Sequence, residues 1–574
     1  MLLLEHLIRC VELYLEKSRI FLFDHYISVY YNIIGDDMKN KNGFTLVELL
    51  AVIAILAILV IIALPNVINM YTTAKKNTFV SEAKAIAKSV SNKYISESMK
   101  GNKISEVSNS NNPLDINKKS MSYIFELDNN GKITRLVVSN DEYCISTNKD
   151  YNELTNEDIK TNCTYEEIHN IAGTLIKRFY EKSGRTDRSL VNSVTFYSDG
   201  RKIDADEVYD VSEENNNSVL MYILPVSNSS LLDIFIVANG KISFPQDSSY
   251  LLSFFKMNGC SSSSNITSIV FNNSVITSKV TNMSHLFAQA ETVSIDCLHW
   301  AGGCYYSVKQ LNNLDLSGFD TKNVINMYGM FMGNQSLKLD VSNLNTENVT
   351  DMSYMFNGVI TDTLDLSNFN TSKVTTMNRM FADTKKLKLL NLSNFNTVNV
   401  KDMSYMFYYS YVPIIDISSF DTSNVTNMGW MFASTESTKI KGLDRINTSS
   451  VTNMDYMFAY TVMDSLILTN FNTSKVISMN GMFCNSDASV INVSSFNTSN
   501  VKTMTGRGFH FCGMFESTKV KTLDLSSFDT SNVTDMFYMF KNTKATSGYA
   551  RTQEDANRFN NTSNIPSTLK FIVK

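Results

Sequence analysis

The longest apolar stretch of the chain runs from Phe44 to Leu64 and contains one ionisable residue, Glu48. A helix over this stretch rises about 1.5 Å per residue and reaches about 30 Å, enough to cross the hydrocarbon core of a bilayer. A carboxylate is costly in such a setting, so we expect Glu48 to have a partner. The pattern predicts a membrane-spanning helix over 44–64.

An amphipathic pattern follows Pro65. Apolar residues recur every three or four positions, as on one stripe of a helix: Phe79, Ala83, Ile86, Val90 and Tyr94. Lysines and Glu82 fill the other face. Because proline removes a backbone donor inside a helix, we expect a kink at Pro65. Together the two patterns predict one helix over 44–98.

The junction before the apolar stretch has a specific arrangement. A short basic segment ends at Gly43, Phe44 follows, Glu48 lies four positions on, and Pro65 closes the apolar run. These residues resemble the leader junction of type IV pilins. The resemblance implies that a prepilin peptidase cuts after Gly43 and that the amine of Phe44 is methylated. It also implies that Glu48 pairs with the N-terminal amine of a neighbouring pilin subunit during assembly.

Other readings of this region stay open. An ordinary membrane anchor fits the apolar run, and Thr45 with Glu48 fits a capping box. A secretory signal fits less well, because no small-residue cleavage site follows the run. A leader is expected over 1–43. Translation is expected to start at Met38, so that 1–37 would not be translated. The alternative is a genuine long leader, helical and cytoplasmic.

The next region, 99–189, is expected to form a small pilin-like head and a spacer helix. Strands over 123–127 and 133–138 flank the turn sequence 128–131, which predicts a hairpin. The polar stretch 100–120 is expected to be a loop. Apolar spacing over 164–182 predicts the spacer helix. Residues 190–260 are predicted to be rich in strands.

Repeats occupy 261–543. Each ends in a phenylalanine, at intervals of mostly 25 or 26 residues: Phe287, Phe331, Phe356, Phe381, Phe407, Phe432, Phe458, Phe483, Phe515 and Phe540. In one unit, Leu364 and Leu366 alternate as in a short strand, and Phe369 fills the interior. Val374, Met377 and Phe381 have helical spacing, so one or two helical turns are expected. One unit cannot bury these residues alone, so the units are expected to stack.

These units resemble the BspA-like leucine-rich repeats of bacterial surface proteins, over about 190–574. The tail 544–574 resembles the closing segment of that family, which implies a C-terminal cap. The expected fold is an α+β pilin-like head on a long N-terminal helix, followed by a leucine-rich-repeat solenoid of about ten units. The resemblance implies exposure at the cell surface, and some family members are adhesins for matrix proteins or other bacteria.

Composition narrows the candidate chemistry. The net charge is −5 and 19% of residues are charged, and no basic, aromatic-rich stripe is present, so nucleic acid is not an expected partner. The histidines are scattered without a catalytic pairing, so we expect no enzyme. The Met stripe of the repeats is expected to pack in the core rather than bind copper. A column of Asn and Asp residues favours turn hydrogen bonds over calcium. We expect no cofactor and no metal.

The eight cysteines offer three candidate disulfides. Cys144 and Cys163 would close a loop in the head, Cys297 and Cys304 flank a short insert, and Cys484 and Cys512 lie about one repeat apart. Cys10 would be lost with the leader, and Cys260 is left over. His299 beside Cys304 invites a metal site, but a disulfide loop is favoured. Export permits disulfides, although the sequence does not fix their pairing.

Aromatic residues at variable repeat positions form a candidate binding surface, since tyrosine and tryptophan favour interfaces. They are Tyr354, Tyr405, Tyr408, Tyr409, Tyr411, Trp430, Tyr456 and Tyr538. The alternative is that several of them simply cover the solenoid. Together, the resemblances to type IV pilins and to BspA-like proteins imply a minor or tip pilus subunit that presents an adhesive repeat domain to an unknown surface or matrix ligand. The alternative function is a membrane-held, pseudopilin-like component of a type II secretion or DNA-uptake machine.

Overall fold

The chain divides into two compact units, Met1–Cys163 and Thr164–Lys574. The computed structural model describes residues 46–102, 104, 106–108, 114, 121–128, 130–140, 142–161, 171–258, 261–290, 306–506 and 512–574, and over 46–64 it describes the backbone alone. The described chain is mostly β with few helices, and the long N-terminal helix is present, as predicted.

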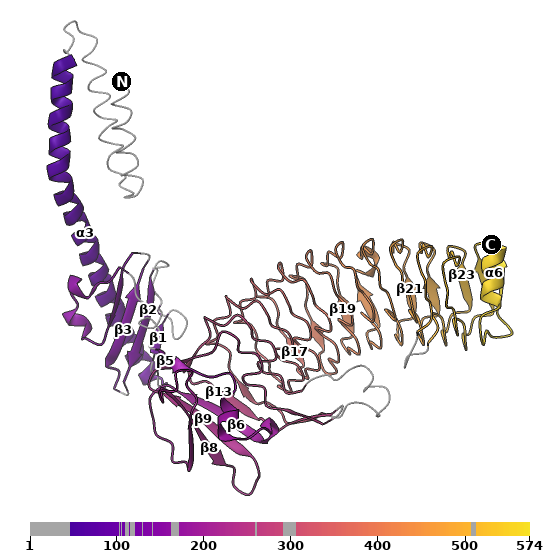
Figure 1. Ribbon diagram of the computed structural model, residues 1–574, viewed down its shortest axis with the longest axis horizontal. Helices are drawn as coiled ribbons and strands as arrows, with labels where there is room; N and C mark the ends of the chain where they lie inside the picture. Colours follow the sequence, from indigo (N-terminus) through magenta and orange to yellow (C-terminus); the bar gives the residue numbers. More distant parts are fainter. Residues whose placement is uncertain are drawn as a thin grey trace. The chain divides into compact units, whose positions relative to one another are not determined.

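The first unit consists of one long helix and one antiparallel sheet (Figure 1). Helix α3 (Leu46–Met99) continues through Pro65. The sheet has the order β1-β2-β3-β4. Its strands are β1 (Glu106–Ser108), β2 (Ser122–Leu127), β3 (Ile133–Ser139) and β4 (Cys144–Thr147), followed by two short 3-10 helices, η1 (Tyr151–Glu153) and η2 (Asn156–Asp158). Strands β2 and β3 form the predicted hairpin.

A separate core holds this unit together. The predicted apolar stripe of α3 supplies Phe79, Ala83, Ile86 and Val90, all buried, and Phe125 and Leu136 of the sheet pack against it. The expectation of a loop over 100–120 is corrected at one place, because Glu106–Ser108 pairs with β2 as an edge strand. Among the described residues, no helix is long and apolar enough to cross a membrane.

The second unit begins with strands. They are β5 (Ile171–Thr174), β6 (Val191–Tyr197), β7 (Glu207–Asp210), β8 (Val219–Pro225), β9 (Leu232–Ala238), β10 (Lys241–Ser243), β11 (Lys256–Asn258), β12 (Ser261–Ser264), β13 (Ser268–Val270), β14 (Val275–Ile276), β15 (Tyr306–Val308) and β16 (Asn313–Leu314), with the 3-10 helices η3 (Phe179–Ser183) and η4 (Arg188–Leu190). They form a six-stranded sheet, β16-β13-β6-β9-β8-β7, and two three-stranded sheets, β14-β10-β5 and β11-β12-β15.

The predicted spacer helix over 164–182 is wrong from Ile171 onward. Residues Ile171–Thr174 form β5, which pairs in parallel with β10, and Phe179 begins a 3-10 helix. Leu175 and Phe179 are buried in the core of this unit rather than on one face of a helix. Gly173 and Thr174 have low helix propensity, and strand pairing decides the conformation.

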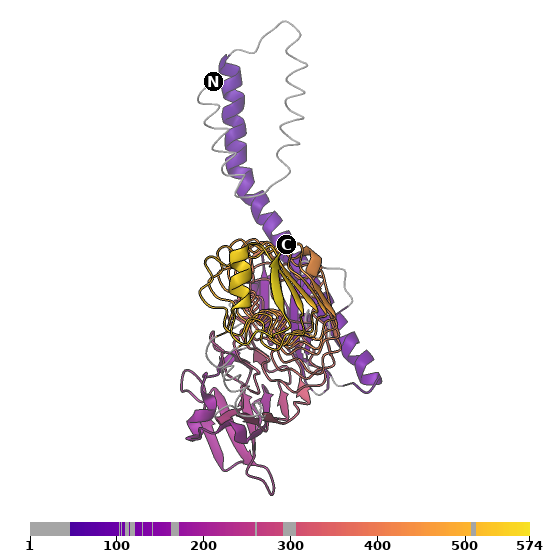
Figure 2. The same cartoon turned by 90° about the vertical axis from the view of Figure 1, so that its right-hand side faces the viewer.

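The repeats stack as successive coils (Figure 1), which superpose when viewed along the stack (Figure 2). Their short strands are β17 (Thr363–Leu364), β18 (Leu389–Leu390), β19 (Ile414–Asp416), β20 (Lys439–Lys441), β21 (Ser465–Ile467), β22 (Val490–Asn492), β23 (Thr522–Leu525), β24 (Ser547–Ala550) and β25 (Lys570–Val573), with one 3-10 helix, η5 (Leu443–Arg445). A second ladder of parallel bridges links Asp247 to Asp535, coil by coil.

The closing phenylalanines form the centre of the stack. All ten, from Phe287 to Phe540, are buried, and each ring lies 5.4 to 6.1 Å from the next. Leu364, Leu366 and Phe369 are also buried. The methionines at the other apolar repeat positions, such as Met377 and Met380, lie in the same core.

The helical turns expected within the repeats are wrong. Val374, Met377 and Phe381 are buried as the pattern requires, but turns connect them. The reason is visible at Arg379, whose φ is 54°, outside the range of a right-handed helix. Its N–H donates to the carbonyl of Ser404 in the next coil, at 3.0 Å, instead of to its own coil.

Buried threonines join the coils near the strand side. Thr371 Oγ1 donates to the carbonyl of Asn396 at 2.9 Å and accepts from the Asn396 N–H at 2.8 Å. The Asn and Asp column makes turn hydrogen bonds, as when Asn370 Oδ1 accepts from the Ser372 N–H at 3.1 Å. Because these threonine and turn groups are hydrogen-bonded, their burial carries little desolvation cost.

Helix α6 (Gln553–Asn560) and β25 cover the last coil (Figures 1 and 2). Phe559 and Phe571 pack on the ring of Phe540 at 5.7 and 4.8 Å. The carboxylate of Asp555 accepts hydrogen bonds from Thr530 and Thr552. These contacts end the core that the stacked coils would otherwise leave open.

Candidate functional site

Two positions each have left-handed backbone in nine of the ten coils. The first, two residues before the closing phenylalanine, has φ between 54° and 60° at His285, Gly329, Tyr354, Arg379, Tyr405, Trp430, Tyr456, Gly481 and Tyr538. The second, two residues after it, has φ between 52° and 71° at Gly333, Gly358, Asp383, Tyr409, Ser434, Tyr460, Asn485, Ser517 and Asn542. This conformation costs roughly 1–2 kcal/mol in a non-glycine residue, so the surroundings must impose it.

Hydrogen bonds between coils impose it at the first position. There the N–H of Tyr405 donates to the carbonyl of Gly429 at 2.9 Å, and that of Trp430 to Asp455 at 2.7 Å. The left-handed conformation at this position directs the N–H toward the next coil. The side chains of the first position are thereby brought into register, one above the next.

The first-position side chains from His285 to Tyr456, together with Tyr250 and with Tyr328 next to Gly329, form an aromatic row along the stack. It consists of Tyr250, His285, Tyr328, Tyr354, Arg379, Tyr405, Trp430 and Tyr456. The ring centroids lie 4.2, 5.0 and 5.1 Å apart from Tyr250 to Tyr354. The Arg379 guanidinium lies 5.5 Å from the Tyr354 ring and 4.3 Å from the Tyr405 ring. Tyr405, Trp430 and Tyr456 then stack at 5.5 and 4.1 Å.

The row is largely buried, which corrects the predicted binding surface. Trp430, Tyr456 and the neighbouring Tyr408 are only 5 to 7% exposed. Tyr354, Tyr405 and Tyr538 are half-buried. Burial raises the pKa of Tyr408 to about 12. Most of the predicted surface residues therefore cover the coils, because stacking along the row buries more ring area than pointing into solvent does.

Three tyrosines remain accessible beside the row. Tyr409, Tyr411 and Tyr460 are 38 to 40% exposed, and we call them the tyrosine patch. Tyr409 and Tyr460 occupy the second left-handed position, two coils apart. The ammonium of Lys385 lies 5.2 Å from the Tyr409 ring. Tyr460 was missed by the sequence reasoning, although it has the same repeat position as Tyr409, which would have identified it.

Two of the described cysteines, Cys484 and Cys512, lie close to this region. Cys484 and Cys512 form a disulfide with a Cα–Cα distance of 6.1 Å, next to Tyr456. Cys144 is disulfide-bonded, but Cys163 lies outside the described residues. So do Cys260, Cys297, His299 and Cys304, and their pairing stays a prediction. The described residues contain no group of three or more His, Cys, Asp or Glu side chains that could hold a metal ion.

The residues of the predicted leader junction are only partly described. Gly43 and Phe44 lie outside the described residues, and Glu48 lies in α3 with its side chain undescribed. Nothing in the structure therefore tests their predicted roles. Their assignment rests on sequence.

The buried side chain of His285, in the aromatic row, is expected to make the stability of the folded state depend on pH. Burial lowers the pKa of His285 from 6.5 to about 4, and Nδ1 has no hydrogen-bond partner among the described residues. The folded state therefore binds fewer protons than the unfolded state between these values. The contribution of His285 to stability is complete above pH 6.5 and is lost as the pH falls toward 4.

We expect the unfolding free energy to fall by up to about 1.4 kcal/mol per pH unit from this group over that window. Urea unfolding at pH 7, 6, 5 and 4 measures the slope. A His285→Tyr variant removes the titrating group and introduces tyrosine, the residue that occupies the same repeat position at 354. The unfolding free energy of this variant should change less steeply with pH. Equal slopes in the two proteins would rule out His285 as the source.

Comparisons with known proteins bear on both ends of the chain. Residues 38–64 match a family described as a prokaryotic N-terminal methylation motif. Residues 302–412, 387–485 and 461–565 match a family described as Mycoplasma protein of unknown function, DUF285. No curated protein matches. Among solved structures, the functional domain of InlJ from Listeria monocytogenes, described as including a cysteine ladder, is 14% identical, with 52% of this chain and 67% of that chain covered and a TM-score of 0.21.

The InlJ likeness is too weak to support any conclusion about this chain. The two family matches confirm the resemblances seen in the sequence. The protein carries an N-terminal methylation motif of the prepilin type, followed by repeats similar to those of the DUF285 family.

Proposed function

We propose that the protein is a pilin-like cell-surface protein, a minor or tip subunit that presents its repeats for adhesion to a protein or to a host or bacterial surface. The observation that carries the proposal is the methylation motif over 38–64 in the same chain as the repeats. A motif of this type implies processing by a prepilin peptidase and assembly with other pilin subunits. Before assembly, the 44–64 segment would hold the protein in the membrane.

The first unit suits the role of a pilin-like head. Helix α3 buries one stripe against an antiparallel sheet, so the same helix can serve both the head and the assembly segment. The second unit suits the role of a leucine-rich-repeat solenoid, since its coils share one elongated core. A repeat region of this size would crowd the wall of a packed filament, which favours a minor subunit over the major one.

The tyrosine patch supports adhesion as the role of the repeats. Tyr409, Tyr411 and Tyr460 offer large, partly exposed rings with polar tips, the side chains that dominate protein interfaces. The buried row beneath them stacks against neighbouring coils and holds the surface rigid. Rigid presentation lowers the entropy lost on binding.

Filament shearing tests the proposal. Sheared filaments should contain the protein at a low ratio to the major pilin, and an antibody against the repeats should label them. A Gly43→Val variant, in which peptidase cleavage should fail, is the control and should stay with the membranes. Retention of the unaltered protein in the membrane fraction without filament label would instead favour the secretion or DNA-uptake component.

A further inference from the structure

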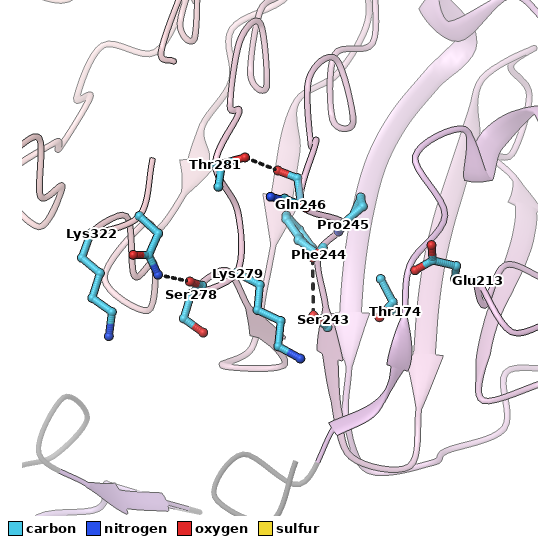
Figure 3. A pocket seen from close by; sticks show the side chains of 11 residues that line it. Thr174, Glu213, Ser243, Phe244, Pro245, Gln246, Ser278, Lys279, Thr281 and Lys322 are labelled. Atoms are coloured by element: carbon cyan, nitrogen blue, oxygen red, sulfur yellow. Dashed lines mark hydrogen bonds between the residues drawn. The ribbon is translucent and has the colours of Figure 1, made fainter. Parts of the chain in front are cut away.

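The cavity at the start of the repeat stack has a lining whose polar groups are engaged within the protein. It has a volume of about 790 Å³ and is lined by residues from the range 174–323 (Figure 3). The ammonium of Lys322 is paired with Asp320 at 3.4 Å, and the amide of Asn323 donates to the carbonyl of Ser278 at 2.7 Å. Because these groups already have partners, the lining favours no particular class of ligand.

The tyrosine patch, in contrast, has a regular geometry along the stack. Tyr409 and Tyr460 occupy the same repeat position two coils apart, and Ser434 occupies it in the coil between them. The backbone ties these coils together, since Tyr409 N–H donates to the carbonyl of Ala433 at 3.1 Å and Ser434 N–H to that of Ala459 at 2.8 Å. Parallel segments bonded in this way lie about 4.8 Å apart, so the two tyrosines are spaced by about 9.6 Å.

Neighbouring coils contact the outer sides of this pair. Lys385, from the coil before Tyr409, has its ammonium 5.2 Å from the Tyr409 ring. Asn485, from the coil after Tyr460, contacts the phenol of Tyr460 with its side chain. The coil between the two rings carries only the short side chain of Ser434 at this position. A ligand therefore reaches both rings from the side of Ser434.

The interval between the two tyrosines matches one regular conformation of polypeptides. A polyproline II helix has three residues per turn and rises about 3.1 Å per residue, so residues i and i+3 face the same side about 9.3 Å apart. In a β-strand, neighbouring residues on one face are about 6.8 Å apart, and two turns of an α-helix span about 10.8 Å. The polyproline II spacing lies closest to the two-coil interval of about 9.6 Å.

The charge beside the patch favours a basic partner. Two nearby lysines, Lys385 and Lys519, pair with Asp383 and Asp487 at 3.1 and 2.8 Å. Glu436, in the coil of Ser434, is exposed and forms no ion pair among the described residues. Its N–H donates to the carbonyl of Ser410 at 3.0 Å, which places it in the coil next to that of Tyr411. An arginine or lysine in the ligand would complement this carboxylate.

We propose that the tyrosine patch binds a proline-rich polypeptide with a basic residue, in the polyproline II conformation and running along the stack. Prolines at positions i and i+3 pack on Tyr409 and Tyr460. Tyr411, whose ring lies 6.2 Å from that of Tyr409, extends the aromatic surface. The backbone carbonyls of a polyproline II chain have no internal partners and can accept from tyrosine hydroxyls. The inference rests on the adhesive function proposed above and names the class of partner.

Binding of a fluorescent decaproline peptide to the purified full chain in detergent micelles tests this inference. The unaltered protein should bind the peptide saturably. A Tyr409→Ser/Tyr460→Ser double variant introduces the residue that position 434 already holds with left-handed backbone, and it should bind at least about tenfold more weakly. Tyr71→Ser removes a 52% exposed tyrosine from helix α3 and, as the control, should leave binding unchanged.

A decaproline peptide that ends in arginine tests the role of Glu436. A Glu436→Gln variant should bind this peptide about two- to fivefold more weakly than the unaltered protein does, since an exposed ion pair contributes modestly to affinity. The same variant should bind uncharged decaproline as before. Equal affinity of both proteins for the arginine peptide would overturn the assignment of a basic residue to the ligand.

Competing probes separate the ligand conformations and classes. A peptide with proline at every third position should compete with decaproline, and one with proline at every fourth position should not. Equal competition by the two would overturn the polyproline II assignment, and competition by cellohexaose would overturn the peptide class in favour of a glycan. Absence of decaproline binding, or binding unchanged in the double tyrosine variant, would overturn the site itself. The assay uses purified protein, so a failure to enter filaments does not affect its outcome.

Discussion

Replacing Phe432 by alanine is expected to lower the free energy of unfolding of the repeats by about 3–5 kcal/mol, the cost of emptying a buried phenylalanine site. Phe432 is fully buried in mid-stack, with the rings of Phe407 and Phe458 at 5.8 and 5.7 Å. Each coil is stabilised mainly by its two neighbours, so the gap weakens two interfaces at once. Chemical denaturation measures the loss.

Phe537 provides a matched control. Phe537 is 44% exposed and lies in another coil of the same stack. The Phe537→Ala substitution should lower the free energy of unfolding by less than about 1 kcal/mol. Hydrogen exchange would localise the effect of Phe432→Ala to the adjoining coils rather than to α6. Equal costs for the two substitutions would mean that the phenylalanine stack does not hold the coils together.

A Glu48→Ala substitution is expected to abolish filament entry while leaving cleavage and export intact. The resemblance to type IV pilins implies that this carboxylate pairs with the N-terminal amine of a neighbouring subunit. Loss of one partner from a buried ion pair costs about 3–5 kcal/mol, so incorporation should fall by more than about 100-fold. Immunoblots that compare the sheared filament fraction with whole-cell protein measure this incorporation.

Glu82→Ala is the control for this substitution. Glu82 lies in the same helix, beyond the apolar stretch, and its loss should leave filament entry unchanged. If Glu48→Ala also left filament entry unchanged, the 44–64 segment would be no more than an anchor. If it blocked cleavage as well, the substitution would report on the peptidase rather than on assembly.

Much of the fold could be predicted because two simple patterns govern it. The apolar stripe at Phe79, Ala83, Ile86 and Val90 identified the buried face of α3, and the repeat of the closing phenylalanine identified the core of the stack. Such patterns report which side chains are buried. They do not determine the backbone conformation between the buried residues, and for that reason the prediction of helical turns at Val374–Phe381 was wrong.

The backbone of the coils depends on contacts between repeats. At Arg379 the left-handed turn is stabilised by an N–H donated to the next coil, an interaction that no single repeat contains. The same limitation applies to the candidate site. Trp430 and Tyr456 occupy variable repeat positions, which suggests exposure, yet stacking along the row buries them. Whether an aromatic side chain is exposed depends on the side chain that packs against it from the next coil.

The pairing of β5 with β10 could not be predicted from the sequence for a related reason. The pattern over 171–174 predicts a helix, so the parallel pairing of this segment with β10 was not expected.

The central claim is that the chain is processed as a prepilin and that its mature form begins at the methylation motif. Mass spectrometry of the N-terminal peptide of the purified mature protein tests this claim most directly. The predicted result is a chain that begins at Phe44 and carries one methyl group on its amine. A mature chain that begins at any other residue would contradict it.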